Sequence, residues 1–206
     1  AVYHLRDGHE GDIGRLARIF AGQAVGLVLG GGGARGFAHL GVIRALEELG
    51  IPIDMVGGTS IGAPVSVPAA WGRSAAEGVK IVRESFSSLL DYTLPVASLL
   101  SGRRITRSIE EWMSDWDIED LWLPFYCVST NLTTAQSVVH RRGNLARAVR
   151  ASVSIPGVLP PVREAGDLLV DGGVLNNVPV DVMRDLNPTG AVIAIDHFGN
   201  LLTNIE

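Results

Sequence analysis

The stretch Ala24-Val25-Gly26-Leu27-Val28-Leu29-Gly30, followed at once by Gly31-Gly32-Gly33-Ala34-Arg35-Gly36, decides the fold class. A short apolar run closed by glycine is typical of a buried strand. Leucine and isoleucine then recur at helical spacing, which predicts a helix over residues 37–49. A second strand is expected at residues 53–57. The segment is therefore a strand–helix–strand unit, of the kind that builds a parallel sheet.

Strand and helix signals alternate through the rest of the chain. Helices are predicted near residues 62–71, 75–90, 144–151 and 179–186, and strands at 124–130, 136–140, 167–171 and 191–196. Residues 91–104 and 152–163 are expected as loops. A helix is expected to begin near Ser108, because Ser108 to Glu111 matches a capping box. This alternation predicts an α/β fold with a mostly parallel sheet covered by helices on both faces.

Composition supports one compact globular domain. The chain has 206 residues, 47% of them hydrophobic, and a mean hydropathy of +0.26, which excludes a disordered chain. Its formal charge of −5 gives no attraction to nucleic acid. The single cysteine, Cys127, excludes an internal disulfide and a multi-cysteine metal site. No signal peptide and no apolar stretch of ~20 residues is visible, so a cytoplasmic protein is expected. The start at Ala1 suggests an excised piece of a longer protein.

Glycine is over-represented, with 25 residues, or about 12% against a typical ~7%. Ten of them fall in three turns that follow predicted strands, at residues 30–36, 57–62 and 171–173. Sites in parallel α/β sheets form at the carboxyl ends of strands. The three turns therefore mark the expected site.

The first turn, Gly31 to Gly36, fits G-x-G-x-x-G between a strand and a helix. A dinucleotide-binding oxidoreductase is one interpretation, but the acid this needs, Asp54, lies at the start of the next strand rather than at its end. The other interpretation is an oxyanion hole, because bare backbone N–H groups at a helix N-terminus stabilise developing negative charge.

The second turn, Gly58-Thr59-Ser60-Ile61-Gly62, fits the G-x-S-x-G nucleophile elbow. Its glycines permit the sharp strand-to-helix turn that exposes a serine at the top of a sheet. The predicted strand before it and helix after it supply the required context. Ser60 is thus the candidate nucleophile.

A serine nucleophile needs a base within hydrogen-bond reach. Among the histidines, only His197 follows the serine in a triad-like order, whereas His39 is expected to pack in its helix and His140 lies in a charged turn. The better candidate is Asp171, which ends a strand and is followed by Gly172 and Gly173. A carboxylate is a weak base in water, but a desolvated, preorganised site makes it a stronger one.

These three blocks, in this order, resemble the patatin-like phospholipases. Residues 151–156 and Pro160-Pro161 also look like that family, and segments between Asp12 and Arg184 look like its neuropathy target esterase branch in the bacterial form. The resemblance covers roughly residues 12–196. It implies a three-layer α/β/α patatin-like fold, with residues 1–23 as a lead-in segment, 24–196 as the catalytic domain and 197–206 as an atypical C-terminal tail.

The resemblance also implies chemistry. Ser60 would be the nucleophile and Asp171 its proton acceptor, without histidine, metal or cofactor. The amides of Gly31, Gly32 and Gly33 would form the oxyanion hole, and the motifs would be supported by Arg35, Gly36, Gly58, Gly62, Gly172 and Gly173. Substrates would be acyl esters of phospholipids or lysophospholipids. Members of this branch often carry cyclic-nucleotide-binding domains upstream.

One apolar cluster has two interpretations. Trp112, Trp116 and Trp122, with Met113 and Leu121, either pack in the core or form a lid or a peripheral membrane contact. Acidic neighbours argue against docking on anionic lipid, whereas Arg103, Arg104 and Arg107 are candidates to meet a headgroup phosphate. A catalytically silent lipid-binding module is the second alternative to the hydrolase.

Overall fold

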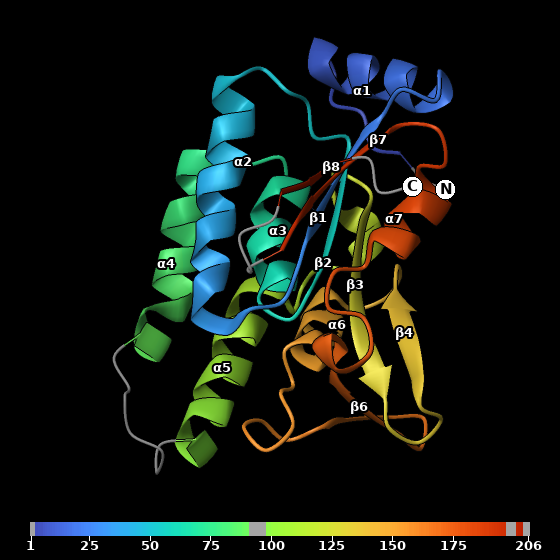
Figure 1. Cartoon of the computed structure of the whole chain (residues 1–206). Helices are drawn as coiled ribbons and strands as arrows, with labels where there is room; N and C mark the ends of the chain where they lie inside the picture. Colours follow the sequence, from blue (N-terminus) through green and yellow to red (C-terminus); the bar gives the residue numbers. More distant parts are fainter. Residues whose placement is uncertain (1–2, 91–97, 197–200, 204–206) are drawn as a thin grey trace.

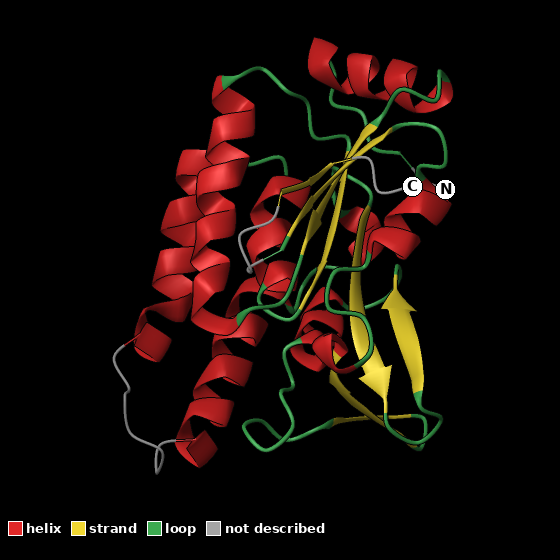
Figure 2. Cartoon of the chain, viewed as in Figure 1, coloured by secondary structure: helices red, strands yellow, loops and turns green. Residues whose placement is uncertain are grey.

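The computed structural model describes residues 3–90, 98–196 and 201–203, with side chains described for residues 3–85 and 105–196. Its described strands form one eight-stranded sheet (Figures 1 and 2). The centre of the sheet has the order β7-β1-β2-β3 and is parallel throughout. These strands are Val25–Leu29 (β1), Met55–Thr59 (β2), Phe125–Asn131 (β3) and Ala191–Ile195 (β7). They are mostly apolar because strands of a parallel sheet are covered on both faces.

Antiparallel strands extend this centre at both edges. Gln136–His140 (β4) and Asp167–Asp171 (β6) both pair with β3, Val162–Glu164 (β5) pairs with β6, and Leu201–Thr203 (β8) pairs with β7. Strand β8 lies in the segment 197–206, which we expected as an atypical tail. The other residues of that segment, 197–200 and 204–206, lie outside the described part of the chain. The predicted loop over residues 152–163 is confirmed except at its two ends, where Ser152 is the last residue of a helix and Val162 begins β5.

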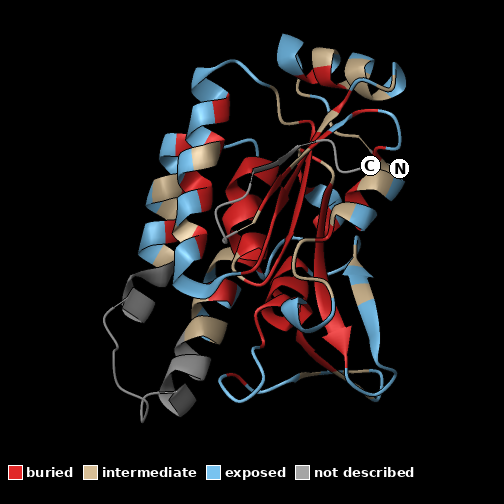
Figure 3. Cartoon of the chain, in the orientation of Figure 1, coloured by how far each residue is buried: buried red, intermediate tan, exposed pale blue. Residues whose placement is uncertain are grey.

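Helices cover the two faces of the sheet, as the three-layer prediction requires (Figure 1). One face is covered by Ala38–Glu48 (α2), Gly62–Ala70 (α3), Ala75–Leu90 (α4), Ser98–Met113 (α5) and Leu145–Ser152 (α6). The other face packs against Val180–Leu186 (α7) and, through Ile19, the helix Glu10–Phe20 (α1). Figure 3 shows the central strands and α3 as the most deeply buried elements. No helix among the described residues has both the length and the apolar character needed to span a membrane.

Helix α5 corrects the sequence prediction. We expected a loop over residues 91–104 and a helix start near Ser108, but α5 begins at Ser98. Ser108 lies inside the helix, and its hydroxyl donates to the carbonyl oxygen of Ser85 in α4 at 2.6 Å. The apparent capping serine is thus an interhelical contact. Residues 91–97 lie outside the described part of the chain.

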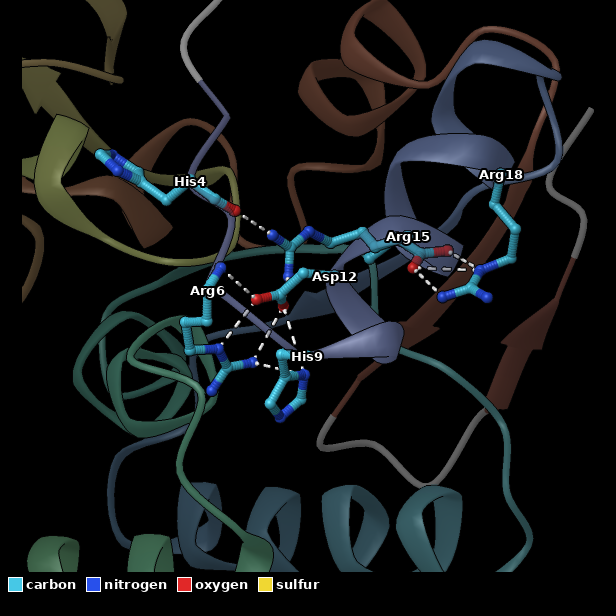
Figure 4. Close-up of polar contacts among 7 residues, drawn as sticks. His4, Arg6, His9, Asp12, Arg15 and Arg18 are labelled. Atoms are coloured by element: carbon cyan, nitrogen blue, oxygen red, sulfur yellow. Dashed lines mark hydrogen bonds and ion pairs between the residues drawn. The ribbon is translucent and has the colours of Figure 1, made fainter.

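Helix α1 falls within the predicted lead-in segment and forms partly buried ion pairs, through Asp12 with the residue Arg6 before it (Figure 4) and through Arg18 with Asp54 beside β2. The Asp12 carboxylate accepts hydrogen bonds from Arg6 and Arg15. The Arg6 guanidinium beside it holds the pKa of Asp12 well below its usual range. Asp54 is fully buried and accepts from Arg18 on α1 and from the Val25 N–H on β1.

We expect Asp54→Ala to lower the free energy of unfolding by about 2–3 kcal/mol, because it leaves a strand N–H unsatisfied and an arginine without its partner. Arg18 is a third exposed, which keeps the loss below that of a fully buried pair. Urea denaturation measures the change. The matched control is Glu48→Ala, which breaks an exposed pair with Arg44 and should cost no more than ~0.5 kcal/mol. Equal losses in both variants would contradict this account of Asp54.

Candidate active site

Ser60 lies in a strained turn between β2 and α3. Its φ of 53° is in the left-handed region, which costs a non-glycine residue roughly 1–2 kcal/mol. The flanking glycines make the turn possible: a Cβ on Gly58 would lie 2.6 Å from the Leu29 carbonyl oxygen, and one on Gly62 would overlap the same oxygen. The end of β1 and the start of α3 are therefore in backbone contact at Ser60.

The sheet register brings Asp171 to Ser60. Strand β4 occupies one edge of β3, so β2 and β6 share the other edge. Thr59, the last residue of β2, pairs with Val128, and Asp171, the last residue of β6, pairs with the next residue, Ser129. The two strands run toward each other and end side by side. The Ser60 Oγ donates a hydrogen bond to Asp171 Oδ2 at 2.6 Å.

Asp171 is held from several directions. Its N–H donates to the Ser154 carbonyl oxygen at 2.9 Å, and its Oδ1 accepts from the Gly173 N–H at 2.7 Å. The serine and the aspartate are only 6% and 5% exposed. Burial raises the pKa of the Asp171 carboxyl above its ordinary value, and the hydrogen bonds from Ser60 and Gly173 offset part of that rise. The site thus makes this carboxylate a stronger base than an exposed one.

This pKa shift has a direction that kinetics can check. If Asp171 must be ionised to act, kcat/KM for an uncharged ester falls as the pH drops through its pKa, and that acid limb lies above the ~4 of an exposed aspartate. A pH–rate profile between pH 4 and 8 measures it. The residual activity of Asp171→Asn should lack this limb. A wild-type profile that stays flat down to pH 4 would contradict the assignment.

The glycine-rich turn passes directly over Ser60. A Cβ on Gly31 would lie 3.0 Å from the Ser60 Cβ, and one on Gly36 would overlap the Ile61 side chain. The Gly31 N–H donates to the Asn177 carbonyl oxygen at 3.1 Å. The Gly32 and Gly33 amides have no acceptor among the described residues, and they precede the 3-10 helix Gly33–Phe37. Of the three predicted oxyanion donors, the two at 32 and 33 are therefore available.

Some of the residues expected to support the motifs make contacts close to the site, and others do not. Gly172 lies against β3, since a Cβ there would overlap the Val128 carbonyl oxygen, and that Cβ would also lie 2.9 Å from the Thr59 side chain at the end of β2. Arg35 is exposed, and its guanidinium makes no hydrogen bond to the part of the chain that the structure describes, so no contact supports the expected bracing of the loop. Asn176 receives a hydrogen bond from Thr59 through its carbonyl oxygen. The segment after Asp171 is thus hydrogen-bonded to the turn at residues 30–36, through Asn177, and to the end of β2 next to Ser60, through Asn176.

A cavity of about 200 Å³ opens beside Ser60. Its walls are almost wholly apolar, and its other lining residues are Gly33, Ala34, Phe37, Ile61, Ile105, Val153, Ile155, Val158 and Leu159. Ile155 and Val158 are 39% and 46% exposed. The cavity therefore suits an apolar chain whose reacting end lies at Ser60, and its rim carries bare apolar side chains.

The other candidate side chains lie elsewhere. His39 is buried and bonds the Gly30 carbonyl oxygen at 2.9 Å, which supports the glycine-rich turn. His140 pairs with Ser129 Oγ at 2.7 Å, and burial lowers its pKa. Burial raises the pKa of Cys127, as expected of an inert core thiol. His197 lies outside the described residues. The described part of the chain holds no cluster of three or more histidine, cysteine or acidic residues that could bind a metal.

The tryptophan cluster is separate from the candidate site. Trp112, Trp116 and Trp122 line a second cavity, of about 410 Å³, together with Trp71. Trp71 caps the end of α3 opposite Ser60, and nine helical residues span about 13 Å. The arrangement therefore gives no support to a lid formed by these side chains. Arg103 and Arg104 lie outside the described side chains, and Arg107 is exposed.

Sequence reasoning missed the residues behind the site. The Ser60 N–H donates to the Ser152 Oγ at 3.0 Å, and the Ser154 carbonyl oxygen accepts a hydrogen bond from the Asp171 N–H. Both serines are fully buried. The sequence marks residues 151–156 as a block of the resembled family, but nothing in one sequence shows which members touch Ser60 or Asp171.

The dinucleotide interpretation fails on its acidic residue. Asp54 is fully buried and its carboxylate is occupied by Arg18 and the Val25 N–H. It cannot reach a ribose hydroxyl. The glycine-rich turn faces Ser60 instead.

Comparison with known proteins identifies the family of the chain. Residues 27–184 match the family model described as patatin-like phospholipase. The human patatin-like phospholipase domain-containing protein 6 is 45% identical over 95% of the chain, and the Saccharomyces cerevisiae lysophospholipase NTE1 is 47% identical over 85%. The chain spans only 15% and 11% of these two relatives.

A solved structure shows the same fold. VipD from Legionella pneumophila superposes with a TM-score of 0.58 at 18% identity, over 76% of this chain and 47% of that one. The family match covers well over half of the chain, and it includes the three glycine-rich turns at residues 30–36, 57–62 and 171–173. The chain belongs to the patatin-like phospholipase family.

Proposed function

We propose that the chain hydrolyses acyl esters of phospholipids or lysophospholipids through Ser60 and Asp171. The observation that carries the proposal is the 2.6 Å hydrogen bond to a buried carboxylate from the Oγ of Ser60, a residue that lines an apolar cavity. The names of the relatives, phospholipase and lysophospholipase, point to the same substrates. The resemblance also implies an upstream cyclic-nucleotide-binding domain in the longer protein, and this stays a prediction.

The reaction has two steps. Asp171 takes the Ser60 hydroxyl proton as Ser60 Oγ bonds to the ester carbonyl carbon, and the N–H groups of Gly32 and Gly33 stabilise the resulting oxyanion. The carbon–oxygen bond to the alcohol breaks, and the alcohol leaves with the proton from Asp171. Asp171 then takes a proton from water, whose oxygen attacks the acyl-serine. The fatty acid leaves and Ser60 regains its proton.

Hydrolysis of a defined lysophospholipid tests the proposal. Wild type should release fatty acid, Ser60→Ala should release none above the uncatalysed rate, and the control Ser66→Ala should retain the activity. Ser66 is also buried and on α3, but its hydroxyl bonds only Ala63. Full activity in Ser60→Ala would overturn the proposal. Lipid binding without hydrolysis by wild type would favour the silent binding module, and tight nicotinamide-cofactor binding would favour the oxidoreductase.

The apolar rim of the cavity supports peripheral contact with a lipid surface, which we include in the proposal. Val158 is half exposed beside the cavity that holds Ser60. Val158→Asp should lower hydrolysis on phosphatidylcholine vesicles by about tenfold, because a charge must be desolvated at the bilayer. Hydrolysis of a monomeric short-chain ester should change less than twofold. Equal losses on both substrates would contradict surface contact.

A further inference from the structure

Arg150 is a buried cation with no described acidic partner. It lies on α6, is 9% exposed, and forms no ion pair with the described side chains. Burial lowers its pKa, and the charge of Glu110 offsets this only in part. Burying a guanidinium without a counter-ion opposes folding. Such a residue is more readily explained by what it positions than by the stability that it adds.

The guanidinium donates to three neutral acceptors, one on α5 and two in the segment that follows α6. Nε donates to Thr106 Oγ1 on α5 at 2.7 Å, Nη1 donates to Ser154 Oγ at 2.5 Å, and Nη2 donates to the Pro160 carbonyl oxygen at 3.1 Å. The Ser154 hydroxyl in turn donates to the Arg150 carbonyl oxygen at 2.7 Å. The planar fork of arginine supplies three diverging donors at once, which lysine cannot do.

The segment held by Arg150 is the one that holds the candidate site. Residues 152–160 run from the end of α6 to Pro160, whose carbonyl oxygen Arg150 holds. Within them, the Ser152 Oγ accepts the Ser60 N–H, and the Ser154 carbonyl oxygen accepts the Asp171 N–H. The same segment supplies four lining residues of the 200 Å³ cavity, namely Val153, Ile155, Val158 and Leu159. The segment that this side chain holds thus contacts the backbones of both reacting residues and supplies part of the cavity wall.

We infer that Arg150 is a positioning residue, which fixes residues 152–160 so that Ser60 and Asp171 keep their contact and the acyl cavity keeps its shape. It touches neither of the two reacting side chains and acts through Ser154 and Pro160, which hold the segment that Ser152 begins. This inference rests on the proposed function for its kinetic consequences. Its structural consequence, ordering of the Ser60 and Asp171 amides, is independent of any activity.

The test compares two arginines of the same helix. Arg150→Met keeps the length and loses the donors. Arg147→Met is the control, because Arg147 is exposed and bonds only the Arg163 carbonyl oxygen and, loosely, Glu164. We expect Arg150→Met to lower kcat by about 10–100-fold, since a misplacement near 1 Å costs about that much, while the melting temperature stays within a few degrees. KM should rise for long-chain esters but not for acetyl esters, because the cavity wall loosens. Arg150→Lys should recover part of kcat.

A double-mutant cycle with Ser154→Ala separates positioning from general damage. The two substitutions should be less than additive in kcat, because both break the same connection. Additive effects, a kcat within twofold of wild type in Arg150→Met, or equal losses in the Arg147 control would overturn the inference. If Arg150→Met fails to fold, Arg150→Lys decides: wild-type kcat in that variant overturns the proposal.

Hydrogen exchange keeps the two proposals distinguishable. The Ser60 and Asp171 amides should exchange faster in Arg150→Met than in Arg147→Met, whether or not the protein hydrolyses esters. Unchanged exchange at both amides would overturn the positioning role while leaving the hydrolase proposal intact. Faster exchange in a protein without esterase activity would retain the positioning role and reject the proposed function.

Discussion

Asp171→Asn is expected to lower kcat/KM by about 10²–10⁴-fold, the range that a positioned general base contributes. The asparagine carbonyl oxygen can still accept from the Gly173 N–H, whereas the NH2 group that replaces Oδ2 can only donate to Ser60 Oγ and cannot take the serine proton. The loss should fall on kcat, with KM nearly unchanged. Steady-state kinetics on one ester measures it, and a loss below fivefold would contradict the role of Asp171 as base.

The same substitution should raise stability at neutral pH. Because the folded-state pKa of Asp171 is raised, the unfolded chain gives up this proton at a lower pH than the folded chain does. Stability therefore falls as the pH rises from about 4 through the folded pKa, and is constant above it. Asparagine removes that fall, so Asp171→Asn should melt at a higher temperature than wild type at pH 7 and show a smaller difference near pH 4. Lower stability at pH 7 would contradict the burial argument.

Gly62→Ala is expected to have the second largest effect, on stability and activity together. The added methyl group would overlap the Leu29 carbonyl oxygen and lie 2.9 Å from that of Gly30. Both are backbone atoms, so no rotamer change relieves the contact, and a loss of at least ~3 kcal/mol is expected. Because the clash lies where β1, the glycine-rich turn and the Ser60 turn meet, ester hydrolysis should fall at least tenfold even below the melting temperature.

Gly41→Ala is the matched control. Gly41 also lies in a helix, α2, but a Cβ there meets nothing within 4 Å. Alanine should therefore stabilise the chain by roughly 0.5–1 kcal/mol through its higher helix propensity, with activity unchanged. Urea denaturation of both variants measures the contrast. Similar free energies of unfolding for Gly62→Ala and wild type would contradict the close packing at the elbow.

The fold, and the contact between the two residues proposed to react, could be predicted in part because each residue has a local signal. The apolar run of residues 25–29 and the glycines at 58 and 62 reflect backbone requirements that are visible in the sequence itself. Asp171 is marked by its place at a strand end before two glycines. Its contact with Ser60 depends on β2 and β6 meeting along β3, which is a matter of register and not of local pattern.

What could not be predicted depends on contacts between distant segments. The Gly31 amide is one of three equivalent glycine amides in the sequence, and only the position of Asn177 shows that it already has an acceptor. Ser108 resembles a helix cap in the sequence, but in the structure its hydroxyl donates to the Ser85 carbonyl oxygen on α4. Arg150 looks like an ordinary charged helix residue, because its three partners lie 4, 10 and 44 residues away in the chain.

Covalent labelling tests the central claim most directly. A fluorophosphonate that carries an alkyl chain should form one adduct, and peptide mass spectrometry should place it on Ser60. Labelling should be much slower in Asp171→Asn, because the serine loses its proton acceptor, and absent in Ser60→Ala. An adduct on another residue, or labelling of Ser60 at an equal rate in Asp171→Asn, would contradict the account of Ser60 and Asp171 as the reacting pair.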